Sequence, residues 1–122
     1  SIYHVTPRAN MVASYEMAEQ VLAQISLPTA IVAGCDEVAI GLIKAFTDQG
    51  IQVPKDIALT SVDNIPIAEF TIPALTTVDV PQTDLGQMAV EMLINRTKQP
   101  DMPLVSMLLP VKLIVRESCG AK

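Results

Sequence analysis

Two short apolar runs, at residues 28–34 (PTAIVAG) and 57–62 (IALTSV), constrain the fold of this chain more than any other feature. Runs of this length and composition are typical of strands that are buried on both faces of a sheet. Between them, residues 36–50 place apolar side chains at helical spacing and end at Gly50, a residue that favours the C-terminal end of a helix. Two such strands joined by a helix form a parallel βαβ unit, so the sequence predicts an α/β fold.

The same alternation of strand and helix patterns continues along the rest of the chain. Asn10 is a suitable N-cap for the first of the helices. We expect further strands at 1–6, 75–80, 104–109 and 111–117, and further helices at 11–25 and 83–97. Because helices separate most of these strands, the sheet is expected to be mostly parallel.

Charge and composition exclude several classes of function. The formal net charge is −5 and the eight Lys and Arg residues are scattered, which argues against a nucleic-acid-binding surface in these residues. No apolar stretch approaches the roughly 20 residues of a transmembrane helix, and the N-terminus lacks the features of a signal peptide. Cys35 and Cys119 have no CxxC spacing, so free thiols in a reducing compartment, the cytoplasm, fit better than a disulfide or a zinc site. We expect no metal and no cofactor.

Acidic residues follow both of these apolar strands, at the carboxyl ends where parallel α/β sheets bind their ligands. Asp63 is either an acceptor for ligand hydroxyls or an ordinary loop carboxylate. Asp36 directly precedes a predicted helix and is expected to cap it. The alternative is that Asp36 and Asp63 form a pair of catalytic carboxylates, but the sequence offers no third residue for such a catalytic site. Cys35 either packs or lines a ligand site. Arg8 either faces solvent or reaches an anionic ligand.

Several short motifs, taken together, resemble a known family. They are PTA at 28–30, Asp36, AIG at 39–41, Gly50, VP at 53–54, DN at 63–64, Pro73, LTTV at 75–78, Pro81, LG at 85–86, LP at 109–110 and RES at 116–118. The chain resembles the C-terminal part of the effector domain of LacI/GalR transcription regulators over almost all residues after about Ala13. The resemblance implies a three-layer βαβ fold of the type I periplasmic-binding-protein kind, with two lobes, a ligand cleft and no catalysis.

The resemblance also implies how the chain is divided between the two lobes. Residues 1–80 and 111–118 would belong to the C-terminal lobe, and the helix and strand at 81–110 to the N-terminal lobe. The DNA-binding headpiece is absent from these residues, so we expect a C-terminal fragment that contacts DNA only through a segment elsewhere. The apolar stripe of the 83–97 helix is then expected to pack on its own sheet or on another copy of the chain.

Effector contacts are carried over from the family position by position. Asp63 matches the carboxylate that commonly binds effector hydroxyls. Cys35 stands where the family usually has a ligand-contacting Asn, Ala9 where many members have a stacking aromatic, and Val80 where some have Gln. These departures leave open a sugar, a sugar phosphate that uses Arg8, or a partner protein as the signal.

The family's C-terminal lobes form dimers through the helix after Asp36 and the segment after Asp63, so a homodimer is expected. The candidate interface residues are Val38, Leu42, Phe46, Ile65, Ile67 and Phe70, with the protein core as the alternative place for them. A type I periplasmic sugar-binding protein of a transporter is the second hypothesis. The ending LLPVKLIVRES favours the regulator.

Overall fold

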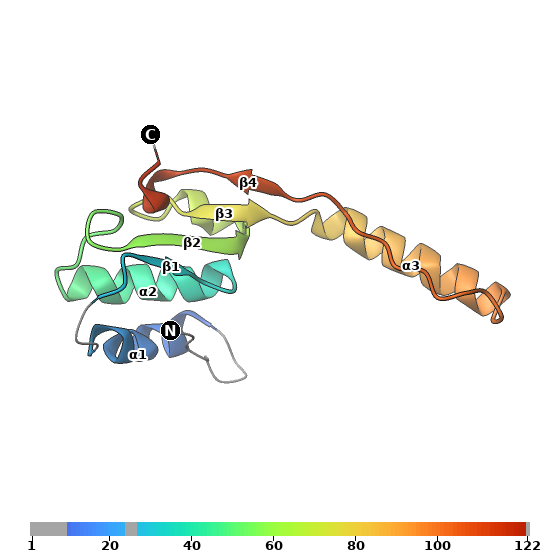
Figure 1. The fold of residues 1–122 in the computed structure, drawn as a ribbon, viewed down its shortest axis with the longest axis horizontal. Helices are drawn as coiled ribbons and strands as arrows, with labels where there is room; N and C mark the ends of the chain where they lie inside the picture. Colours follow the sequence, from blue (N-terminus) through green and yellow to red (C-terminus); the bar gives the residue numbers. More distant parts are fainter. Residues whose placement is uncertain (1–9, 24–26, 122) are drawn as a thin grey trace.

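A sheet of four strands in the order β1-β2-β3-β4 organises the part of the chain that the structure describes (Figure 1). The structure is a computed structural model that describes residues 10–23 and 27–121. Strands β1 (Ala30–Val32), β2 (Ala58–Asp63) and β3 (Thr76–Asp79) are parallel, and β4 (Lys112–Ile114) is antiparallel to β3. The predicted α/β class with a mostly parallel sheet is confirmed. The strand expected at 1–6 lies outside the described residues.

Two helices form the layer that covers the sheet. Helix α1 (Met11–Leu22) begins as predicted, because the side chain of Asn10 accepts a hydrogen bond from the Ala13 N–H at 2.9 Å. Helix α2 (Asp36–Asp48) lies between α1 and the strands (Figure 1). Its apolar face forms the core with buried side chains that include Leu59 of β2 and Leu75, the residue directly before β3.

Gly41 permits a close crossing of α1 and α2. A Cβ atom at this position would collide with the Ser14 hydroxyl and with the carbonyl oxygen of Met11. Ser14 is itself fully buried and donates to the carbonyl oxygens of Asn10 and Met11, each at 3.0 Å. The glycine of the AIG motif is therefore needed for helix packing and not for an unusual backbone conformation.

Asp36 connects the start of α2 to both central strands. It is 0% exposed. Its Oδ1 accepts hydrogen bonds from the hydroxyls of Ser61 on β2 and Thr77 on β3, and its Oδ2 accepts one from the Ile65 N–H at 2.8 Å. The prediction that Asp36 caps its helix is wrong. Cys35 is the N-cap residue, and the carboxylate turns to the sheet because three donors meet it there.

Helix α3 (Gln82–Lys98) projects from the rest of the structure (Figure 1). None of its residues is buried, and Leu85 and Leu93 are 51% and 65% exposed. The expectation that its apolar stripe packs on the chain's own sheet is therefore wrong. Packing on another copy of the chain stays a prediction.

Residues 104–109 do not form the predicted strand. They lie in the segment that leads from the end of α3 back to β4 (Figure 1), and they pair with no strand in the described part of the chain. An apolar sequence with β-branched residues becomes a strand only where a neighbouring strand satisfies its backbone groups. Pairing with β3 begins only at Lys112.

We expect Gly41→Ala to lower the free energy of unfolding by about 2 kcal/mol, because the new methyl group forces α1 and α2 apart. Urea unfolding followed by circular dichroism measures the loss. Gly86→Ala on α3 is the matched control, since a Cβ atom there meets nothing within 4 Å. Equal stability of the two variants would contradict the close helix crossing.

We expect Asp36→Asn to lower the free energy of unfolding by on the order of 3 kcal/mol, because the amide places its own donor among three buried donors. Glu37→Gln removes the same charge from the same helical turn at an exposed position and serves as the control. Urea unfolding of both variants gives the comparison. A loss no larger than that of the control would show that the Asp36 hydrogen bonds do not hold the fold.

Candidate functional site

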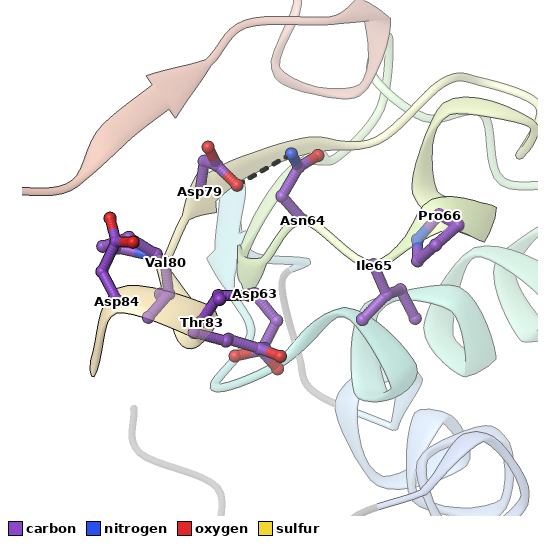
Figure 2. A pocket seen from close by; sticks show the side chains of 10 residues that line it. Asp63, Asn64, Ile65, Pro66, Asp79, Val80, Thr83 and Asp84 are labelled. Carbon is purple, nitrogen blue, oxygen red and sulfur yellow. Dashed lines mark hydrogen bonds between the residues drawn. The ribbon is translucent and has the colours of Figure 1, made fainter. Parts of the chain in front are cut away.

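The ends of β2 and β3 form one wall of a cavity. Asp63 and Asp79 are the last residues of these strands and are paired in the parallel register. The cavity has a volume of about 330 Å³ and is lined by residues 63–66 and 79–84 (Figure 2). It therefore lies at the carboxyl ends of parallel strands, which is where sheets of this kind bind ligands.

Asp63 has an unusual backbone and an unused carboxylate. Its φ is 120° and that of Asn64 is 54°, values that L-residues rarely adopt. Its side chain has no hydrogen-bond partner among residues 10–23 and 27–121. Burial raises the pKa of the Asp63 carboxyl, and the negative charges of Asp36 and Glu37 raise it further. Strain and an unpaired acceptor at a cavity wall are features of a ligand site.

Asn64 is held by partners on both sides of its amide. Its Nδ2 donates to Asp79 Oδ1 at 3.0 Å, and its Oδ1 accepts from Arg116 Nη2 at 2.9 Å. Figure 2 shows the side chains of Asn64 and Asp79 facing one another at the cavity. Sequence reasoning did not single out Asn64, Asp79 or Arg116 as site residues. The DN and RES motifs contain two of them, but only the pairing of β2, β3 and β4 brings the three together.

The predicted effector residues do not all meet in the cavity. Asp63 and Val80 line it together. Cys35 is half-buried at the start of α2 and does not line it. The expectation that Asp36 contacts the effector is corrected by the structure. Asp36 is fully buried and both its oxygens accept hydrogen bonds, so it is available neither to an effector nor to a catalytic pair. Arg8 and Ala9 lie outside the described residues.

The predicted interface residues on α2 also need correction. Val38, Leu42 and Phe46 are at most 6% exposed and belong to the core, because the apolar face of α2 meets the sheet and α1. An interface role for these three is wrong. Ile65 is half-buried against the core, whereas Ile67 and Phe70 are exposed and stay predictions.

The described residues hold no group of three or more His, Cys, Asp or Glu side chains that could bind a metal ion. The carboxylates at the cavity do not form such a group either. Over the same part of the chain, no helix has both the length and the apolar character that crossing a membrane requires.

Comparisons with known proteins agree with this architecture. Residues 2–119 match the family of periplasmic binding protein-like domains. The HTH-type transcriptional repressor PurR of Glaesserella parasuis is 41% identical over 85% of this chain and 32% of its own length. The lac repressor dimer bound to operator and the anti-inducer ONPF superimposes with a TM-score of 0.82 at 29% identity, over 92% of this chain and 39% of that one.

A LacI family transcriptional regulator of Enterococcus faecalis V583 with bound ribose has a TM-score of 0.79 at 33% identity, over 89% of this chain and 40% of that one. The chain spans about a third of the length of the G. parasuis repressor. The motifs, the mostly parallel sheet and the position of the cavity all fit the same assignment. The chain therefore belongs to the family of periplasmic-binding-protein-like domains, in the branch of the LacI-type transcriptional regulators.

Proposed function

We propose that this chain is the effector-binding portion of a LacI-type transcriptional regulator and that a sugar-like molecule binds in the cavity at the ends of β2 and β3. The unpaired Asp63 carboxylate carries the proposal. An ionised carboxylate offers several acceptor sites and suits a ligand with neighbouring hydroxyl groups. The bound ribose of the E. faecalis regulator supports free pentoses as the first ligands to test.

The cavity is placed to couple ligand binding to the position of α3. Residues 79–84 lead from β3 into α3, while residues 63–66 belong to the sheet side. A ligand that contacts both would favour one arrangement of α3 relative to the sheet, which is a population shift. We propose that residues 1–80 and 111–118 form one lobe and that residues 81–110 belong to a second lobe.

The remaining partners follow from the same proposal. The regulator would act in the cytoplasm as a homodimer and contact DNA through a headpiece outside these residues, as the repressors among its relatives suggest. Exposed Ile67 and Phe70 are the candidate dimer contacts. We propose no catalysis, because Asp36 is fully buried and three donors within the chain hold its carboxylate, so it cannot form a catalytic pair with Asp63.

We expect Asp63→Asn to weaken effector binding by roughly tenfold or more, because an amide offers fewer acceptors to hydroxyl groups and lacks the charge that strengthens them. Isothermal titration of the natural full-length protein with D-ribose and other free sugars measures the effect. Asp101→Asn removes an exposed charge beyond α3 and is the control. Full affinity in Asp63→Asn would remove Asp63 from the site.

We also expect Asp63→Asn to raise the melting temperature at neutral pH. The pKa of Asp63 is higher in the folded protein than its ordinary value of 3.8, so the folded state binds this proton more tightly than the unfolded chain does. The ionised carboxylate therefore destabilises the fold above the folded-state pKa, and this cost shrinks as the pH falls from that value and is gone below the ordinary value of 3.8. The advantage of the variant should shrink toward acidic pH in thermal unfolding scans. An advantage that is constant with pH would contradict the assigned cause.

A further inference from the structure

We propose that the cavity selects a ligand without an anionic group, and that Asp79 is a second acceptor for ligand hydroxyls whose orientation is set by Arg116 through Asn64. This inference rests on the proposed function of the cavity and names the chemical class of its ligand. Neither Asp79 nor Arg116 was expected at the site from the sequence, and the hydrogen bonds between the two residues and Asn64 assign them to it.

The charges on the cavity wall are all of one sign. Asp63, Asp79 and Asp84 line it, and no Lys or Arg is found among residues 63–66 and 79–84. A free sugar presents hydroxyl donors to these carboxylates. A phosphate group would bring negative charge to the same wall and would meet no cationic side chain among these lining residues. Repulsion between the phosphate and a carboxylate about 4 Å away, in a partly desolvated site, weakens binding by about tenfold for each such carboxylate.

The chemistry of the partners decides the orientation of the Asn64 amide. Arg116 is anchored by a hydrogen bond from Nη1 to the Leu75 carbonyl oxygen at 2.7 Å, and its Nη2 donates to Asn64 Oδ1. Guanidinium only donates, so it requires the amide oxygen on its side. The Asn64 Nδ2 must then face Asp79, whose Oδ1 accepts from it. A flipped amide would set two donors against each other on one side and two acceptors on the other.

The hydrogen bonds from Arg116 to Asn64 and from Asn64 to Asp79 leave one carboxylate oxygen of Asp79 free to accept from a ligand. Oδ1 is held by Asn64, while Oδ2 has no hydrogen-bond partner in the part of the chain that the structure describes. Asp79 lines the cavity and is paired in register with Asp63, so the two carboxylates come from adjacent strands. Figure 2 shows the two carboxylates on opposite sides of the strand ends, so each would accept hydroxyl groups from a different part of the ligand.

The two nearby cations, Lys112 and Arg116, are not among the residues that line the cavity. Lys112 is the cross-strand neighbour of Asp79 on β4, but the described residues contain no ion pair between them. Arg116 uses its guanidinium on Leu75 and Asn64. Neither residue belongs to the cavity lining. The positive charge therefore orients the acceptors without offering a phosphate a direct contact.

The first experiment compares free sugars with their phosphates by isothermal titration of the natural full-length protein. The pairs are D-ribose with ribose 5-phosphate, D-glucose with glucose 6-phosphate, and D-galactose with galactose 6-phosphate. We expect at least one free sugar to bind, and its phosphate to bind roughly tenfold or more weakly. Equal or tighter binding of a phosphate overturns this inference and leaves the proposed function standing. Binding of no sugar of either kind overturns both.

The second experiment tests the residues through the affinity ratio of free to phosphorylated sugar. We expect Asp79→Asn to weaken free-sugar binding and to reduce the ratio by about tenfold. Asp84→Asn removes the same charge from the cavity wall, but Asn64 does not hold Asp84. A smaller change in the ratio is expected for it, because Asp84 is exposed and solvent screens its charge more than that of half-buried Asp79. An equal change in the two variants would show that general charge, and not the oriented Asp79, sets the selectivity.

The role of Arg116 is tested with Arg116→Lys, which keeps the charge but cannot reach Leu75 and Asn64 with one planar group. We expect free-sugar affinity to fall as in Asp79→Asn, because Asp79 is no longer oriented, in protein that still unfolds cooperatively. A variant with lower stability and unchanged free-sugar affinity would reduce Arg116 to a structural residue. If Arg116→Lys does not fold, Asn64→Ala tests the same link, because it removes the donor to Asp79. Unchanged free-sugar affinity in that variant overturns the orienting role.

Discussion

The buried carboxylate of Asp36 is the interaction on which the rest of this structure depends. It is the common acceptor for a hydroxyl of β2, a hydroxyl of β3 and the N–H of Ile65. One charged group thereby joins the first turn of α2, the two central strands and the loop that follows β2. A buried carboxylate is costly unless its lone pairs are used, and here three donors use them. Asp63 and Asn64 directly precede Ile65, so the hydrogen bond between Ile65 and Asp36 also restrains the backbone of the candidate site.

Two aspartates at neighbouring strand ends have opposite roles because their partners differ. Asp36 has all its donors within the chain and is structural. Asp63 has none among the described residues, has a positive φ and has a raised pKa that burial causes first. Such a residue is expected to destabilise the folded chain unless a ligand supplies its partners, which is why we propose Asp63 as an effector contact. Residue type and position after a strand could not separate the two; the hydrogen bonds do.

Helix α3 shows the same dependence on partners at a larger scale. Its periodicity correctly indicates a helix, yet no residue of Gln82–Lys98 is buried. Isolated helices of this length are marginal in water, and most helices in proteins gain their stability from packing of an apolar face. A second lobe that covers α3, as we propose, would supply that packing. It would also turn the cavity at the start of α3 into a site between two moving parts.

The sequence by itself determined the helices at α1, α2 and α3, the strands β1 and β2, and the family, because periodicity, caps and short motifs depend on residues that are close together in the chain. It also made Asp63 the first candidate for the site, which stays a prediction. It misplaced the role of Asp36, put Val38, Leu42 and Phe46 on a surface and predicted a strand at 104–109. Only the tertiary structure decided these points, and it alone joined Asn64, Asp79 and Arg116. A local pattern states that a face is apolar or that a group is polar. Which partner that face or group meets depends on strand pairing and helix packing between residues far apart in the chain.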